Sequence, residues 1–307
     1  MHFLITGGAG FIGSNIAHKL LETGRKVRIL DNFSSGKEAN LADIKNDIEL
    51  IRGDIRDIDT VRKAVEGIDF VYHQAALASV QASIDNPLES HEINLTGTLN
   101  MLEQARQAGV KKFIMASSAA VYGDSPVLPK HEKMLPEPLS PYAVHKLTGE
   151  YYLRLYWQLY KFPTVALRYF NVFGPRQDPK SDYAAVIPCF IDRMVRSKAP
   201  TVFGDGEQTR DFIYIDNCVA ANLLAAENED MVGEVFNVAG GDQFTLNQLL
   251  EELRTITGKN IKAVYEPARP GDIRYSYASI DKIKKVGFKP RVGFSEGLKN
   301  TVEYFAG

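Results

Sequence analysis

Cysteine is scarce in this chain of 307 residues, and the potential metal ligands are spread out. The only two cysteines are Cys189 and Cys218, and the six histidines form no cluster. A disulfide framework needs several cysteines, and a zinc site needs cysteines or histidines at short, paired spacings. We therefore expect neither a disulfide framework nor a bound metal. So few cysteines fit a protein of the reducing cytoplasm.

The sequence also lacks a long apolar run and a basic excess. Its first apolar stretch, Phe3-Leu4-Ile5, leads directly into glycines, and no segment approaches the roughly 20 apolar residues that span a bilayer. The formal net charge is -2, whereas nucleic-acid-binding modules usually carry a strong positive excess. We expect a soluble protein that binds neither membranes nor nucleic acids.

What the sequence does contain is a regular alternation of short β-rich runs with helical patterns. The β-rich runs predict strands over 2–6, 26–31, 48–52, 70–73, 112–117 and 164–169. The helical patterns predict helices over 11–22, 60–65, 87–108 and 141–160. Such alternation is typical of a parallel sheet with right-handed crossovers. We therefore predict an α/β fold built on a doubly wound parallel sheet.

The pattern changes after residue 170. Shorter segments with Gly-Pro, Asp-Gly and Arg-Pro-Gly turns follow, although 235–238 predicts one more strand for the first sheet. We expect a nucleotide-binding domain over residues 1–170 and a smaller α/β lobe, mainly for substrate, over 171–307. The sequence contains no long linker, so a cleft between the two is expected.

Glycines between the first predicted strand and helix indicate a nucleotide site. In Gly7-Gly-Ala-Gly10-Phe11-Ile12-Gly13, glycines allow a tight turn and let backbone amides and the helix N-terminus face a pyrophosphate. Asp31 ends the next strand, where a carboxylate can accept hydrogen bonds from ribose hydroxyls. This acid, followed by Asn32 rather than a basic residue, would repel a 2′-phosphate and favours NAD over NADP. A turn aspartate is the alternative for Asp31.

The third predicted strand leads into another candidate segment for the same nucleotide. Asp54 and Ile55 follow that strand directly. Asp54 either approaches the adenine or serves as a solvated loop acid or helix cap. We include both residues in the expected cofactor site.

A tyrosine and a lysine four residues apart are the strongest indication of chemistry. Tyr142 and Lys146 lie in a predicted helix, where this spacing puts both side chains on one face. A fixed positive charge favours the phenolate and should lower the pKa of Tyr142 from its usual value of about 10. Tyr142 would then be a usable base. The alternative is an ordinary amphipathic helix with a solvated lysine.

These motifs together resemble the extended short-chain dehydrogenase/reductase family. The resemblance rests on the three spaced glycines, on Ala-Ser-Ser-Ala-Ala-Val-Tyr-Gly over 116–123 and on the Tyr142/Lys146 pair. It implies a Rossmann-type domain with bound NAD and a catalytic set of Ser118, Tyr142 and Lys146. It also implies backbone contacts to the cofactor from Ala75 and Ala76.

The second half of the chain resembles the nucleotide-sugar epimerases of that family. The similar segments begin at Arg168, Tyr183, Gly204 and Arg269. This resemblance implies a UDP-sugar as substrate and inversion at its C4 through a 4-keto sugar. The residues expected to bind the substrate, besides Ser118 and Tyr142, are Asn171, Val186, Arg210, Arg269, Asp272 and Ser276.

Two of these arginines have a chemical reason for their assignment. The guanidinium groups of Arg210 and Arg269 match the geometry of a diphosphate, although both could instead be solvated surface residues. Asn171 either donates to the diphosphate or sugar, or forms a turn. By resemblance, a small residue at Ser276 leaves room for a 2-N-acetyl group, so both plain and N-acetylated UDP-hexoses are expected substrates; a solvated loop serine is the alternative.

Other chemistries of the family fit the sequence less well. The related 4,6-dehydratases carry an Asp-Glu pair where Ala119-Ala120 stand here, and UDP-glucuronate decarboxylases tend to carry a glutamate at Ala120. UDP-glucuronate 4-epimerase needs the same catalytic set and remains open. A catalytically inactive NAD-binding sensor or scaffold is the alternative from a different class. By resemblance, helices over 87–108 and 141–160 could pair in a homodimer.

Overall fold

A large parallel sheet forms the centre of the molecule. The computed structural model describes residues 1–180, 185–268 and 274–306. In spatial order the sheet consists of β11 (Glu234–Val238), β6 (Thr164–Tyr169), β5 (Lys112–Ser118), β4 (Phe70–His73), β1 (His2–Thr6), β2 (Lys26–Asp31) and β3 (Ile48–Arg52). Every neighbouring pair in it is parallel. The predicted doubly wound α/β fold is confirmed.

Alternation along the strands divides the core into two halves, one on each face of the sheet. Phe3 and Ile5 point to the face covered by α1 (Phe11–Glu22) and α8 (Ile215–Glu227). Leu4, between them, points to the opposite face, which α2 (Ile58–Val65), α5 (Gly97–Gln107) and α6 (Pro141–Tyr160) cover. Because both faces are covered, the central strands are largely apolar, as is typical of parallel sheets.

Helix α6 begins and ends where its sequence predicts. The Ser140 side chain caps it by accepting from the Ala143 N–H, and Pro141 occupies the first turn, where no backbone donor is needed. The helix ends at Lys161, which has a left-handed conformation with φ of 54°. These signals fix the start of the helix that carries Tyr142 and Lys146.

The single helix predicted over 87–108 is wrong in detail. The segment consists of α4 (Pro87–His91), a π-helical turn (Glu92–Thr96) and α5. Asn94, in the π turn, hydrogen-bonds both the N–H of Leu77 (2.7 Å) and its carbonyl oxygen (3.2 Å). The side chain of Asn94 thereby ties the wider turn to the loop after β4, a tertiary contact that helical periodicity does not reveal. The short α3 (Val80–Asp85) precedes this segment.

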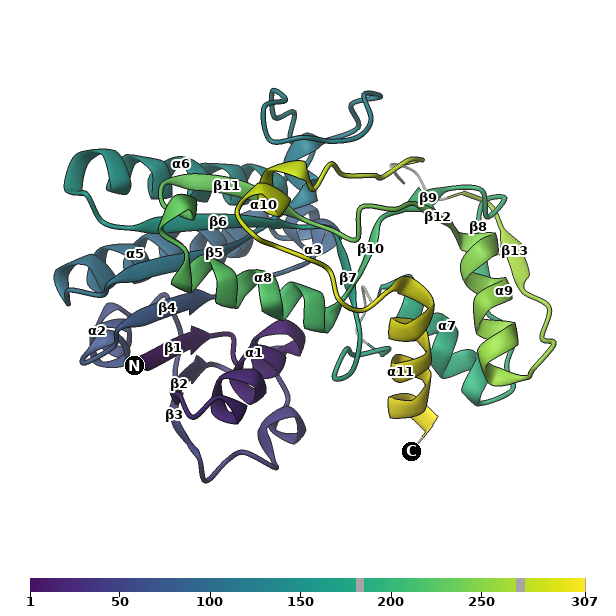
Figure 1. Cartoon of the computed structure of the whole chain (residues 1–307), viewed down its shortest axis with the longest axis horizontal. Helices are drawn as coiled ribbons and strands as arrows, with labels where there is room; N and C mark the ends of the chain where they lie inside the picture. The colour runs from purple at the N-terminus through teal and green to yellow at the C-terminus, as the bar shows by residue number, and fades with distance from the viewer. Residues whose placement is uncertain (181–184, 269–273, 307) are drawn as a thin grey trace.

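The C-terminal part of the chain builds a smaller lobe beside the large sheet (Figure 1). Its helices are α7 (Val186–Val195), α9 (Leu246–Thr257) and α11 (Phe294–Ala306), gathered on the right in Figure 1. Among its described residues, the strands form three two-stranded sheets: β7 (Asn171–Phe173) with β10 (Phe212–Tyr214), β8 (Thr201–Phe203) with β13 (Val264–Glu266), and β9 (Thr209–Arg210) with β12 (Phe244–Thr245).

Part of this later sequence returns to the large sheet. Strand β11 pairs with β6 along its whole length, and the short α10 (Asp281–Lys285) packs against β11. The two parts of the molecule are therefore connected by several chain crossings rather than by one linker. In the described ranges, no helix combines the length and apolarity needed to cross a membrane.

Candidate functional site

The carboxyl ends of the parallel strands bring the predicted residues to one edge of the large sheet. Gly7 follows β1, Asp31 ends β2, Ala75 follows β4, Ser118 ends β5 and Asn171 follows β6 closely. Ligands of open α/β sheets bind at this edge. The candidate site is therefore built by segments that are distant in the sequence.

The glycine loop after β1 is packed too closely for side chains. Gly7 has a φ of +69°, and a Cβ on it would lie 2.8 Å from the backbone nitrogen of Ala75. A Cβ on Gly13 would overlap the carbonyl oxygen of Gly7. Gly10 is the N-cap of α1, so no side chain caps this helix, and its first turn, which includes Phe11 and Ile12, contains no acid. The helix start is thus suited to an anion such as a pyrophosphate.

Asp31 holds the glycine loop from the neighbouring strand. Its carboxylate is buried and accepts from the N–H groups of Ala9 and Phe33, at 2.8 Å each. Burial raises the pKa of Asp31, and these two backbone hydrogen bonds oppose that rise. The acid predicted to meet a ribose therefore lies against the loop predicted to meet the pyrophosphate.

The Asp54 carboxylate is already hydrogen-bonded to other side chains of the protein. Both of its oxygens accept from Arg56, and one also accepts from the Asn32 side chain at 2.8 Å. The Arg56 guanidinium lowers the pKa of Asp54 to about 2. This geometry favours the loop-acid alternative over a contact of the Asp54 carboxylate with adenine. Ile55 is buried and leaves no room for a side chain at Gly97.

The loop after β4 reaches the glycine loop through its backbone. The Ala75 N–H donates to the Thr6 hydroxyl at 3.2 Å, and the main chain of Ala75 lies directly beside Gly7. Ala76 follows, half-buried. Small side chains at this point are consistent with the close approach of backbone to a ligand.

Ser118, Tyr142 and Lys146 lie together where β5 meets α6. The Ser118 side chain lies close enough to the Tyr142 phenol to lower its pKa. The Lys146 Nζ donates to the carbonyl oxygen of Ala116 at 2.8 Å and lies 5.7 Å from the centre of the Tyr142 ring. A hydroxyl, a phenol and an amine thus converge at the carboxyl edge of the sheet.

The expected lowering of the Tyr142 pKa is wrong. Burial raises the pKa of Tyr142, and only the hydrogen bond from Ser118 opposes the rise. Burial also lowers the pKa of Lys146 to about 8, against the opposing charge of Glu150. The physical reason is that burial disfavours both charged forms, while the ammonium donates to a backbone carbonyl.

Two of the substrate residues predicted in the second half, Asn171 and Arg210, lie on strands of the small sheets. Asn171 donates from its side chain to the Asp211 carbonyl oxygen at 3.1 Å, and Arg210 donates to the carbonyl oxygen of Thr209 at 2.9 Å. Val186 opens α7 and is half-buried. Arg269 and Asp272 lie outside the described residues.

The pairing of strand segments puts Ser276 next to Arg210. Thr209 pairs with Tyr275 in a parallel bridge, and the Ser276 N–H donates to the carbonyl oxygen of Thr209 at 3.2 Å. Paired residues share a face, and adjacent residues alternate, so Ser276 and Arg210 lie on the same side and Tyr275 on the other. The structure therefore brings these two predicted substrate residues together.

Sequence reasoning missed a buried cluster of polar side chains next to the catalytic candidates. Ser117 donates to Glu150 at 2.5 Å, and Glu150 forms a two-pronged ion pair with Arg168. The signals were present in the sequence: polar residues inside two apolar strands, and a carboxylate four residues after Lys146. Their significance depends on three segments meeting in space.

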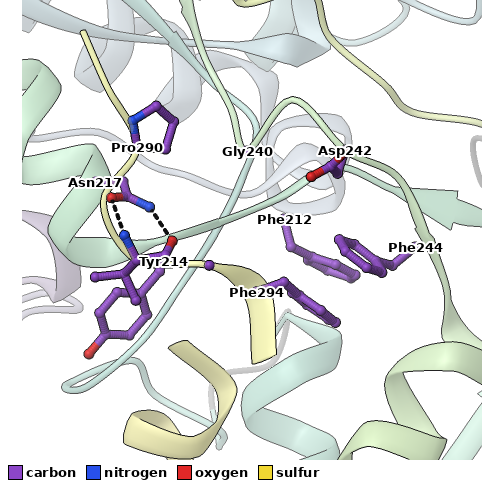
Figure 2. Close-up of a pocket in the computed structure, with 10 residues that line it drawn as sticks. Phe212, Tyr214, Asn217, Gly240, Asp242, Phe244, Pro290 and Phe294 are labelled. Carbon is purple, nitrogen blue, oxygen red and sulfur yellow. Dashed lines mark hydrogen bonds between the residues drawn. The ribbon is translucent and has the colours of Figure 1, made fainter. Parts of the chain in front are cut away.

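A pocket in the C-terminal lobe does not coincide with this site. Figure 2 shows its aromatic rings, in which Phe294 stacks on Phe244 (4.0 Å between ring centres) and on Phe212 (5.5 Å). The cavity measures about 150 Å³, and none of the residues that line it is a predicted site residue. Asn217 closes one side through hydrogen bonds to the backbone of Val292. We assign this pocket to the packing of the lobe.

The described residues contain no group of three His, Cys, Asp or Glu side chains that would hold a metal. The arrangement at the sheet edge instead offers a phenol, a hydroxyl and an amine beside a dinucleotide-type loop. These groups can move a proton at a carbon-bound oxygen and hold that oxygen in place.

Known proteins are similar to this chain in sequence. Residues 3–239 match the model of the NAD dependent epimerase/dehydratase family. UDP-glucose 4-epimerase from Mycolicibacterium smegmatis is 36% identical to this chain over 310 residues, which cover 99% of this chain and 98% of that protein.

Solved structures are similar over nearly the whole chain. UDP-glucose 4-epimerase from Thermotoga maritima with UDP-glucose is 42% identical, with a TM-score of 0.94, and the match covers 99% of this chain and 98% of that one. UDP-N-acetylglucosamine 4-epimerase from Methanobrevibacter ruminantium, in complex with UDP-N-acetylmuramic acid, is also 42% identical, with a TM-score of 0.95 and coverage of 99% and 97%.

We predict that Gly13→Ala prevents NAD binding. The new Cβ would overlap the Gly7 carbonyl oxygen and lie 2.8 Å from the Gly8 Cα, and these backbone atoms cannot yield without moving the loop. NAD affinity should fall at least about tenfold, measured by titration and by the NAD released on denaturation.

Gly293→Ala is the matched control, because a Cβ there meets nothing within 4 Å and its φ is not positive. Equal NAD content in the Gly13→Ala variant and the wild type would show that the close packing of the loop is not needed for the cofactor.

Proposed function

We propose that this chain, which belongs to the NAD-dependent epimerase/dehydratase family, is an enzyme that inverts C4 of UDP-hexoses through a transient 4-keto sugar. The observation that carries the proposal is the convergence of Ser118, Tyr142 and Lys146 beside the glycine loop. We further propose that residues 1–170 bind NAD and that 171–307 mainly bind the UDP-sugar.

The residues around the loop are suited to NAD. The uncapped start of α1 and the packed glycines would face the pyrophosphate, and Asp31 would meet a ribose. Bound NAD would supply a hydride acceptor at the sugar C4 and return the hydride to the opposite face of the ring. Ala75 and Ala76 would approach the cofactor through their backbone.

The chain's own residues would perform the proton chemistry. Tyr142 would remove the proton from the 4-hydroxyl group and return it after the sugar has turned. Ser118, whose side chain lies near the Tyr142 phenol, would hold the same oxygen. Lys146 would favour the phenolate by its charge, opposing the effect of burial on Tyr142.

The C-terminal lobe would anchor the nucleotide part of the substrate. The side-by-side placement of Arg210 and Ser276 supports a contact of Arg210 with the diphosphate while Ser276 borders the sugar. Asn171 and Val186 would lie along the same substrate, with Arg269 and Asp272 as the further predicted contacts. A firmly held diphosphate leaves the sugar ring free to present either face.

The accepted sugar is the finer part of the proposal. Ser276 supports activity on both the UDP-glucose/UDP-galactose and the UDP-N-acetylglucosamine/UDP-N-acetylgalactosamine pairs, because its small side chain leaves space beside the ring. The similar solved structures include one epimerase named for each kind of substrate, at the same identity. UDP-glucuronate 4-epimerisation remains the alternative, since it uses the same catalytic set.

Tyr142→Phe tests the reaction itself. The variant should keep its fold and bound NAD but lose about 10²–10⁴-fold in the rate of C4 inversion, because only the proton-transferring hydroxyl is removed. A coupled assay on the UDP-sugars measures the rate. Tyr304→Phe, the same change on the exposed α11, should leave the rate unchanged. Similar turnover in the Tyr142→Phe variant and the wild type would remove Tyr142 from the mechanism.

Ser276→Tyr tests the sugar preference. The bulky ring should suppress activity on the N-acetylated pair while sparing the plain hexoses, measured as kcat/KM for each substrate. The control is Tyr275→Ser, because Tyr275 faces the other side of its segment and should not affect the preference. Equal loss on both pairs in Ser276→Tyr would show that this residue does not border the sugar.

We also propose that two copies of the chain form a homodimer through α6. Val144, Tyr151, Leu155 and Leu159 lie on one side of this helix at helical spacing, and each is 45–67% exposed. An apolar stripe of this kind is expected at an interface rather than in water.

Leu155→Glu should therefore convert a dimer of 34.2 kDa chains into monomers, because it places a charge in the stripe. Light scattering during gel filtration measures the mass. Val264→Glu, a comparable change at a half-exposed apolar residue of β13, should leave the mass unchanged. A wild-type protein that is monomeric at micromolar concentration would contradict the proposal.

A further inference from the structure

Three consecutive residues at the end of β5 meet three different parts of α6. Hydrogen bonds join Ala116 to Lys146 and Ser117 to Glu150, and Ser118 lies near the Tyr142 phenol and lowers its pKa. Two of these helix residues belong to the proposed catalytic set. The third, Glu150, has no part in the reaction as proposed above.

Glu150 is buried and fully engaged. It is 4% exposed, and its two oxygens accept from Arg168 Nε (2.8 Å) and Nη2 (2.7 Å). The oxygen bonded to Nε also accepts from the Ser117 hydroxyl at 2.5 Å. Ser117 and Arg168 are paired residues of β5 and β6, so both present their side chains to Glu150 from the same face of the sheet.

An ion pair this deeply buried is poorly explained by stability alone. Removing both charges from water costs several kcal/mol, and well-packed apolar residues are often as stable or more so. The pair must therefore be considered with its neighbours. Glu150 follows Lys146 by four residues, a spacing that puts Cβ atoms about 5–6 Å apart on one helix face.

The charge of Glu150 acts on Lys146 in a direction opposite to burial. Burial lowers the pKa of Lys146 to about 8, and Glu150 raises it. The other titratable groups around the amine are Tyr142 and His145 on α6 and His73 on β4. His73 stays neutral near pH 7, because burial lowers its pKa to about 3. Unlike these three groups, Glu150 is a carboxylate, and its negative charge raises the pKa of Lys146.

We propose that Glu150 is a positioning residue that keeps Lys146 protonated and holds α6 against β5, with Ser117 and Arg168 fixing its carboxylate. The assignment deepens the proposed function, because Lys146 matters as a charge beside Tyr142. The competing possibility, a purely structural ion pair, predicts a different outcome in the following experiment.

The test is the titration of Lys146 in Glu150→Gln, which keeps the shape of the side chain and removes its charge. NMR of the full-length protein with labelled lysine side chains follows the titration, and Lys146→Ala assigns the signal. We expect the midpoint of Lys146 to fall by about one pH unit, since an opposite charge nearby typically moves a pKa by about 1–3. The limb of the pH–rate profile that reports Lys146 should move to lower pH by the same amount.

Three further variants separate charge from stability. Glu150→Asp keeps the charge and should retain a Lys146 midpoint close to that of the wild type. The double variant Glu150→Gln/Arg168→Met removes both buried charges and should regain thermal stability relative to Glu150→Gln. Glu103→Gln is the matched control, because Glu103 also accepts twice from an arginine and once from a hydroxyl, from Arg106 and Tyr156 on α5 and α6.

A Lys146 midpoint in Glu150→Gln equal to that of the wild type would overturn the proposal, whatever the loss of stability. So would a midpoint in Glu150→Asp that falls as far as the midpoint in Glu150→Gln. The NMR titration does not require turnover, so it remains valid if no UDP-sugar is epimerised. Loss of the proposed function and loss of this inference are therefore distinguishable.

Discussion

The docking of α6 onto the end of β5 determines where the reactive groups lie. Lys146 and its partner Ala116 are 30 residues apart in the chain, so their meeting depends on the packing of helix against sheet. The sheet fixes β5 from both sides, and the Ser140 cap with Pro141 fixes the start of α6. Because hydrogen bonds tolerate only a few tenths of an ångström, a small shift of this helix would separate Lys146 from Ala116.

A second constraint joins the large sheet to the smaller lobe. The carboxylate of Asp211 is buried and accepts from the N–H groups of Gly240, Gly241 and Ala278. Its carbonyl oxygen accepts from Asn171. Asp211 directly follows Arg210. It therefore joins three parts of the chain by hydrogen bonds: the segment after β11, the segment near Ser276 and the end of β6. These hydrogen bonds fix the position of the expected substrate site relative to the large sheet.

The sequence predicts the elements of this fold better than their interactions. The positions of the strands in the large sheet and of α6 follow from local periodicity and caps, and both are confirmed. The π-helical turn around Asn94 was not predicted, because its cause is a contact with the distant Leu77. The role of Glu150 was missed for the same reason, since it needs β5, β6 and α6 together. Local spacing suggested the Tyr142/Lys146 pair, but the direction of the Tyr142 pKa depends on burial, which spacing does not contain.

Burial disfavours the charged forms of both Tyr142 and Lys146. It favours the neutral phenol of Tyr142 and the neutral amine of Lys146, and a single protein group opposes it in each case. For Tyr142 that group is Ser118, at the end of β5, and for Lys146 it is Glu150, which Ser117 holds from the same strand. The contact between β5 and α6 therefore governs the protonation of these residues as well as their placement. Geometry and acid–base behaviour at this site are two consequences of one packing arrangement.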